Sequence, residues 1–117
     1  MADPLAGLKK ELRAFARRRG WEKYHTPKNL SMALSVEASE LAEIFQWLTP
    51  AQSRTLTREQ RVHLGEEIAD VLLYLVRLSD VCGVDVRAAV RDKIQKNAAK
   101  YPPRLTRLGL TSRRRPR

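Results

Sequence analysis

The chain has 117 residues, enough for one domain with a single hydrophobic core but not for two. Hydrophobic residues make up 43% of it and charged residues 31%, a balance typical of a folded domain. No run of about eighteen apolar residues occurs, and the first residues lack an apolar signal segment, so we expect neither a membrane span nor a secretory signal. The single cysteine, Cys82, excludes an internal disulfide and a cysteine-based zinc site. It lies in an apolar helical run, so we expect a core thiol in a cytoplasmic protein.

The net charge of +10 suggests nucleic acid as a partner, but the charge is unevenly distributed. Six of the ten net positive charges are arginines in residues 104–117, a segment without acidic residues, which leaves +4 for residues 1–103. We therefore expect a mildly basic domain over residues 1–103 and a basic, disordered tail over residues 104–117. Contact of this tail with RNA or an anionic surface is the less favoured interpretation, and a solvated terminus is preferred.

In chain order, the apolar periodicity first predicts a helix over about Leu5–Arg19, which ends at Gly20. A loop follows, because Pro27 disfavours helical backbone at the residue before it. The second predicted helix covers about Leu30–Leu48 and is closed by Thr49–Pro50.

After a short polar connection, Thr57 and Gln60 have the spacing of a capping box and begin the third helix, which ends at Gly83. Its predicted apolar stripe consists of Leu64, Ile68, Val71, Leu75, Leu78 and Cys82. The fourth helix is expected from about Asp85 to Lys100. Because the second and third helices are long and joined by a short connection, they should pack antiparallel. The predicted fold class is all-α, a four-helix bundle.

Glu37 occupies a position in the second helix where a core residue is expected. The apolar series of that helix, with gaps of three and four, is Leu30, Leu34, Leu41, Ile44 and Leu48, and position 37 is missing from it. A buried lone carboxylate is costly unless something neutralises it. Glu37 and Glu40 are three residues apart, as are Glu67 and Asp70 in the third helix, so each pair shares one helix face. Antiparallel packing would bring all four carboxylates together, and a site with only oxygen ligands favours Mg²⁺, or Mn²⁺.

The alternative is that these acids lie on the surface and pair with basic residues four positions away. The obvious basic partners are mostly absent, since the positions four residues later hold Leu41, Ile44, Val71 and Tyr74. One Glu-x-x-Glu motif is a weak signal, but two beside apolar stripes on adjacent helices are more specific. The pattern therefore predicts a metal site.

A Mg²⁺ site usually keeps positions for water and substrate phosphates. Candidates for binding phosphate are on the fourth helix and just after it: Lys93, Lys96, Asn97, Lys100 and Tyr101. A solvated basic face explains these residues equally well. Candidates for binding a base or sugar are Trp21, His25, Asn29, Trp47 and Tyr74, although aromatic residues on helix faces more often pack in a core.

Three segments, GWEKYHTPKNLSMALSVEASELAEIFQW, EEIADVLLYL and DKIQKNAAKYP, together resemble the MazG-like all-α nucleotide pyrophosphohydrolases, particularly the dCTP pyrophosphatase branch. The resemblance covers about Leu5 to Pro103 and implies Mg²⁺-dependent hydrolysis of nucleoside triphosphates, dCTP and modified dCTP above all, to the monophosphate and pyrophosphate. It implies a homo-oligomer, and we expect a tetramer rather than a dimer. The metal ligands it implies are Glu37, Glu40, Glu67 and Asp70. It assigns Lys93, Asn97 and Tyr101 to the triphosphate, and Trp21, Trp47 and Tyr74 to the nucleoside.

The sequence departs from this family at Leu12, where some relatives have a histidine near the base, and this bears on the preference for cytosine. Glu40 or Glu43 is our candidate for the general base, and Lys93 and Lys96 would neutralise the leaving pyrophosphate.

A ferritin-like di-metal bundle is disfavoured, because the only Glu-x-x-His motif starts at Glu22, in a loop. A non-enzymatic basic helical protein that binds nucleic acid remains as the alternative. We assign no role to His63.

Overall fold

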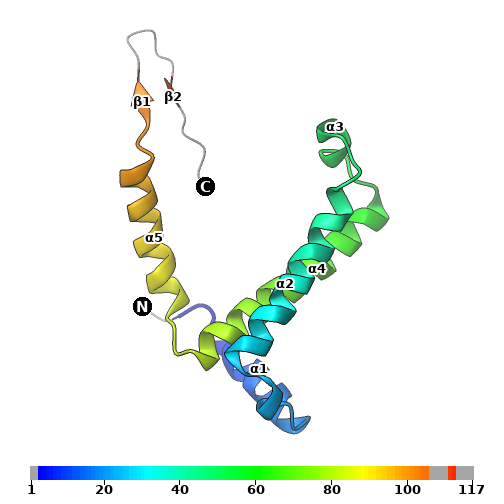
Figure 1. The fold of residues 1–117 in the computed structure, drawn as a ribbon, viewed down its shortest axis with the longest axis vertical. Helices are drawn as coiled ribbons and strands as arrows, with labels where there is room; N and C mark the ends of the chain where they lie inside the picture. The colour runs from blue at the N-terminus through cyan, green and yellow to red at the C-terminus, as the bar shows by residue number, and fades with distance from the viewer. Residues whose placement is uncertain (1–2, 106–110, 113–117) are drawn as a thin grey trace. The chain divides into compact units, whose positions relative to one another are not determined.

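The computed structural model describes residues 3–105 and 111–112 (Figure 1). Its elements, in order, are α1 (Ala6–Arg18), the 3₁₀ helix η1 (Glu22–Tyr24), α2 (Pro27–Phe45), α3 (Pro50–Ser53), α4 (Arg58–Val81), α5 (Val86–Lys100), β1 (Arg104–Leu105) and β2 (Thr111–Ser112). Helices dominate, so the predicted all-α class is confirmed. The chain divides into two compact units, Met1–Val84 and Asp85–Arg117, and each is described by itself.

The first unit is built around α2 and α4, which lie side by side and run in opposite directions (Figure 1). Helix α1 packs on α4 as well. The fully buried apolar side chains of this unit are Ala16, Leu30 and Val76, one from each of these three helices. The expected antiparallel pair is therefore confirmed, and it places the faces of α2 and α4 that carry acidic residues opposite each other.

Helix α2 begins and ends three residues earlier than the periodicity predicted. Pro27 occupies its first turn, where a missing N–H costs nothing, and Thr26 caps it by accepting a hydrogen bond from the Asn29 N–H (3.1 Å). The helix ends at Phe45, so Trp47 follows it rather than belonging to it. The polar connection contains a further short helix, α3, with its own capping box between Thr49 and Gln52.

The predicted capping box of Thr57 and Gln60 begins α4 as expected, and Gly83 follows its end with a φ of 66°. Cys82 is the C-cap residue and is exposed. The expectation of a core thiol was therefore wrong, because Cys82 lies beyond the last residue of the helix.

The buried face of α4 is rotated relative to the predicted stripe. Ile68 and Leu75 are 50% and 45% exposed, whereas Glu67 and Val76 are 8% and 1% exposed. The remaining apolar members of the stripe, Leu64, Val71 and Leu78, are half-buried. The face that packs against α2 thus carries Glu67 among its buried residues.

In the second unit, the Asp85 side chain accepts a hydrogen bond from the Ala88 N–H (3.1 Å) and caps α5, whose bounds match the prediction closely. Strands β1 and β2 pair antiparallel, with Arg104 opposite Ser112. These short strands differ from the expectation of a tail without regular structure; residues 106–110 and 113–117 lie outside the described residues. Within the described part of the chain, no helix is long and apolar enough to cross a membrane.

Candidate active site: a carboxylate cluster beside an aromatic pocket

Three of the four predicted metal ligands come together between α2 and α4. Glu37 of α2 and Glu67 and Asp70 of α4 each offer a carboxylate oxygen, and these three atoms lie within 4.8 Å of one another. The spacing of three residues on α4 puts Glu67 and Asp70 on one face, and the antiparallel neighbour supplies Glu37. The cluster follows directly from the pairing of the two helices.

The carboxylates of the cluster are short of hydrogen-bond donors. Among the described residues, neither Glu37 Oε2 nor Glu67 Oε2 has a hydrogen-bond partner, although both atoms are buried. The pKa of Glu37 is raised to about 7. Burial is the largest cause, and the neighbouring carboxyl groups of Glu40, Glu67 and Asp70 raise it further. A carboxylate cluster of this kind needs a proton or a cation to relieve its repulsion.

The donor set fits a divalent cation. Glu37 Oε2 and Glu67 Oε2 are buried and unpartnered among the described residues, and the three clustered oxygens lie close together. Hard oxygen ligands are those that Mg²⁺ and Mn²⁺ take. Glu40 is half-buried and near enough to raise the pKa of Glu37, but it is outside the group of three. Glu43 is exposed. Metal binding by Glu40, and catalysis by Glu40 or Glu43, stay predictions.

The sequence reading missed a neighbour of the cluster, His63. Its Nε2 lies 3.5 Å from Glu67 Oε1, one helical turn away on α4. The spacing of four residues between a histidine and a buried glutamate was the signal that could have found it.

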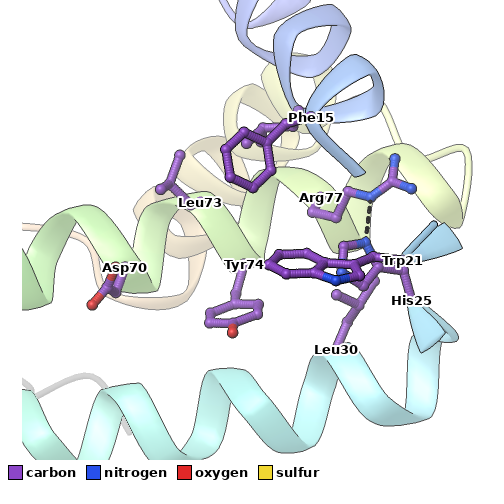
Figure 2. A pocket seen from close by; sticks show the side chains of 9 residues that line it. Phe15, Trp21, His25, Leu30, Asp70, Leu73, Tyr74 and Arg77 are labelled. Carbon is purple, nitrogen blue, oxygen red and sulfur yellow. Dashed lines mark hydrogen bonds between the residues drawn. The ribbon is translucent and has the colours of Figure 1, made fainter. Parts of the chain in front are cut away.

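A cavity of about 160 Å³ adjoins the cluster (Figure 2). Asp70 belongs to both, since it lines this cavity and is one of the three clustered carboxylates. The lining comes from α1, α2, α4 and the segment before α2: Leu12, Phe15, Trp21, His25, Leu30, Asp70, Leu73, Tyr74 and Arg77. An apolar pocket with a few polar groups, next to clustered acids, is a typical ligand site.

Local contacts hold the aromatic wall of the pocket in place. The Trp21 N–H donates to the Ala16 carbonyl (2.9 Å) after the turn at Gly20, whose φ of 64° favours glycine. The Trp21 ring then packs edge-on against Phe15 and His25, with centroids 5.8 Å and 6.2 Å away.

The predicted nucleoside-binding residues divide into two groups. Trp21, His25 and Tyr74 line the pocket, whereas Asn29 and Trp47 do not. The Asn29 side chain instead donates to the Tyr24 carbonyl (3.0 Å) and fastens the loop, and Trp47 is 86% exposed. A direct role of the last two in nucleoside binding stays a prediction.

Arg77 is a pocket residue that the sequence reading did not identify. Its Nε donates to His25 Nδ1 (3.0 Å), as Figure 2 shows, and its side chain is only 12% exposed. Burial and the positive charge of Arg77 lower the pKa of His25 below its ordinary value. An arginine three residues after Tyr74 on the same face was the available signal.

The predicted phosphate-binding residues are in the second unit. Lys96 Nζ forms an ion pair with Asp92 (2.9 Å), and Lys100 Nζ lies 5.4 Å from the centre of the Tyr101 ring. Tyr101 and Asn97 are half-buried, and the Tyr101 N–H donates to the Asn97 carbonyl (2.8 Å). The binding of phosphate by Lys93, Lys96, Asn97 and Tyr101 stays a prediction.

An antiparallel helix pair thus places three clustered carboxylates, which could hold a metal ion, beside a pocket with an aromatic lining. The family is given by comparison of the sequence: the model of the MazG-like family matches residues 32–105. The chain belongs to the MazG-like family, as the motifs had indicated.

Two kinds of relative agree with this placement. The chain is 44% identical over 95 residues to dCTP pyrophosphatase 1 of Homo sapiens and to that of Rattus norvegicus, a match covering 80% of this chain and 56% of each relative. It therefore spans little more than half the length of these curated relatives. A crystal structure of a pyrophosphatase from Archaeoglobus fulgidus DSM 4304 matches with a TM-score of 0.81 and 43% identity, covering 87% of this chain and 95% of that one.

Proposed function

We propose that the chain hydrolyses nucleoside triphosphates, preferentially dCTP and modified dCTP, to the monophosphate and pyrophosphate. One observation carries this proposal: Asp70 belongs both to the carboxylate cluster and to the aromatic pocket. A cation held by the cluster would thus lie beside whatever ring the pocket holds. The similarity to proteins named dCTP pyrophosphatase 1 supports this choice of substrate.

The size of the pocket favours a pyrimidine. A cavity of roughly 150 Å³ is known to accommodate a benzene molecule. The pocket here measures about 160 Å³ and is partly open to solvent, so it has room for one six-membered ring. Trp21 and Tyr74 would pack against such a ring.

The roles of the residues follow from this placement. Glu37, Glu67 and Asp70, with Glu40 as a fourth ligand, would hold Mg²⁺, with Mn²⁺ as a substitute. When bound, the cation supplies positive charge to the phosphate oxygens and increases the acidity of water. Glu40 or Glu43 would accept the proton of the attacking water as it adds to the α-phosphorus, and pyrophosphate leaves. Lys93 and Lys96 would neutralise the leaving group, with Asn97 and Tyr101 as further phosphate contacts.

We also propose that the working protein is a homotetramer in the cytoplasm, with a dimer as the smaller alternative. Ile68, Leu72 and Leu75 form an apolar strip on α4, each at least 45% exposed in the chain. Exposed apolar strips of this kind usually mark an interface. Sedimentation should give a tetramer, and Leu72→Asp should shift it to smaller species, whereas Arg61→Asp, on the same helix, should not. A monomeric wild type would reject the proposal.

Pyrophosphate release from a panel of deoxy- and ribonucleoside triphosphates, with Mg²⁺ and with EDTA, tests the reaction. We expect metal-dependent release, with kcat/KM for dCTP at least about tenfold above the purine nucleotides, because the pocket matches a single six-membered ring better than a fused one. A flat base profile would retain the reaction and reject the base preference, with Leu12 as the first residue to examine. No release by the folded protein would reject the reaction and favour the alternative, a non-enzymatic protein that binds nucleic acid through its net charge of +10.

A further inference from the structure

A series of three charged contacts, two of them hydrogen-bonded and one an ion pair, links Arg13 at the surface to the pocket. Arg13 of α1 donates to both carboxylate oxygens of Asp80, with Nε 2.6 Å from Oδ2. Arg77 NH1 lies 3.6 Å from the same Asp80 Oδ2, and Arg77 Nε donates to His25 Nδ1 (3.0 Å). The side chains of Asp80 and Arg77 are only 11% and 12% exposed, so this series of contacts is largely shielded from water at its inner end. It joins α1, α4 and the segment before α2.

Asp80 keeps Arg77 in place. The hydrogen bonds from Arg13 have the largest effect on Asp80 and hold its pKa below the usual range. The nearby charge of Arg77 lowers it further. The carboxylate is therefore charged at neutral pH, hydrogen-bonded by the guanidinium of Arg13 and ion-paired with that of Arg77. An arginine held by a shielded carboxylate has a fixed fork of donors rather than a freely moving side chain.

The bond from Arg77 determines which nitrogen of His25 carries the proton. A guanidinium only donates, so His25 Nδ1 must accept and cannot bear a proton. Burial and the charge of Arg77 lower the pKa of His25, so the ring is neutral near pH 7. Its single proton is then on Nε2. Without Arg77, the ring could exchange between its two neutral tautomers.

The polar groups that line the pocket therefore differ in whether they donate or accept hydrogen bonds. The guanidinium of Arg77 and the Nε2–H of His25 are donors, the Tyr74 hydroxyl can donate or accept, and Asp70 is engaged in the carboxylate cluster. Cytosine carries two adjacent acceptors, O2 and N3, whereas uracil and thymine carry an N–H donor at N3. A donor of the pocket meets an acceptor when the base is cytosine. When the base is uracil or thymine, it meets the N3–H donor, and both donors are left unpaired.

We propose that Arg77 is a positioning residue that fixes His25 as a hydrogen-bond donor and thereby makes the pocket prefer cytosine to uracil and thymine. This inference rests on the proposed function, because it assumes that the pocket holds the base. It assigns the discrimination to Arg77 and His25, which line the same pocket as Leu12.

The tautomer can be read directly on the full chain by nitrogen NMR of the imidazole ring. In the wild type, we expect Nδ1 without a proton and Nε2 protonated. In Arg77→Met, we expect both nitrogens to show a mixture of the two forms. Arg77→Lys retains a charged donor and should restore the wild-type pattern in part.

The same variants should change base preference. In Arg77→Met, the ratio of kcat/KM for dCTP over dUTP should fall about tenfold, mainly through a higher KM for dCTP, while kcat changes little. Arg13→Met removes the other arginine on Asp80 and leaves the Arg77–His25 bond, so it should keep the ratio within about twofold.

Two outcomes would overturn the inference: a proton on His25 Nδ1 in the wild type, or an Arg77→Met variant in which all nucleotides lose activity equally and the ratio is unchanged. Binding of dCMP and dUMP without metal separates this inference from the reaction. A wild type that prefers dCMP but releases no pyrophosphate would reject the proposed hydrolysis and keep the role of Arg77. Equal binding of dCMP and dUMP would reject that role even if hydrolysis is observed.

Discussion

Replacing Glu67 by glutamine is expected to reduce nucleotide hydrolysis at least about a hundredfold and, at the same time, to make the metal-free protein more stable. Glu67 is 8% exposed, and its Oε2 has no hydrogen-bond partner among the described residues. Glutamine keeps the size of the side chain but removes a charge that the metal requires, so the site loses its cation and most of its catalysis. It also removes like-charge repulsion from Glu37 and Asp70, which should add roughly 1–3 kcal/mol to the free energy of unfolding without metal.

Lower hydrolysis together with higher stability in the absence of metal distinguishes a metal ligand from a residue that only supports the fold. Urea unfolding in EDTA gives the stability, and pyrophosphate release in Mg²⁺ gives the rate. Glu66→Gln is a matched control, since Glu66 is the adjacent residue on α4 and is exposed; it should change neither quantity appreciably. A Glu67→Gln protein that is less stable than the wild type in EDTA would contradict the repulsion within the cluster. Near-wild-type hydrolysis would contradict metal binding by Glu67.

Most of the fold and half of the site could be predicted from local patterns. Thr57 and Gln60 mark the start of α4 because the capping box is encoded within four residues. The same pattern at Thr49 and Gln52 was overlooked, since the Thr–Pro pair also fits the end of a helix. Glu37, Glu67 and Asp70 could be brought together on paper because antiparallel packing and helical spacing suffice to do so.

The rest depends on how each helix is rotated about its axis, which sequence spacing gives only to within about one position per turn. The stripe predicted for α4 included Ile68, but the rotation found in the structure buries Val76 and leaves Ile68 half exposed. For the same reason, the inward position of Arg77 was not predicted, because an arginine on an amphipathic helix is ordinarily placed in solvent. Only the tertiary partners His25 and Asp80 reveal that this arginine faces inward.

The stability of the metal-free protein should fall as the pH rises from about 5 to 8, and Mg²⁺ should reverse the fall. The folded pKa of Glu37 is about 7, above its ordinary value of 4.5, because of burial and the neighbouring carboxyl groups. Between these two values the folded chain holds a proton that the unfolded chain has released, so the contribution of Glu37 is complete below about pH 4.5 and is lost through about pH 7. We expect a loss of about 1–3 kcal/mol, less than the full shift implies because the group is only half-buried.

Other groups change stability in the same pH range, so a difference between two proteins is needed to isolate Glu37. The pKa of His25 is lowered, so its contribution has the opposite sign and is lost as the pH falls below about 6.5. The lowered pKa of Asp80 matters only below about pH 4. Subtracting the stability of Glu37→Gln from that of the wild type removes both contributions, and the remaining difference should decrease with pH.

Mg²⁺ competes with the proton for the same carboxylates, so its effect should increase with pH. At a concentration a hundred times its dissociation constant, a ligand adds about 2.7 kcal/mol to the stability of the folded state. Thermal unfolding at pH 5.5 and pH 8, with Mg²⁺ and with EDTA, should show the larger gain at pH 8 in the wild type and little gain at either pH in Glu37→Gln. The exposed Glu66→Gln should follow the wild type. An equal gain at both pH values would mean that the ion binds elsewhere than at the carboxylates whose crowding raises the pKa of Glu37.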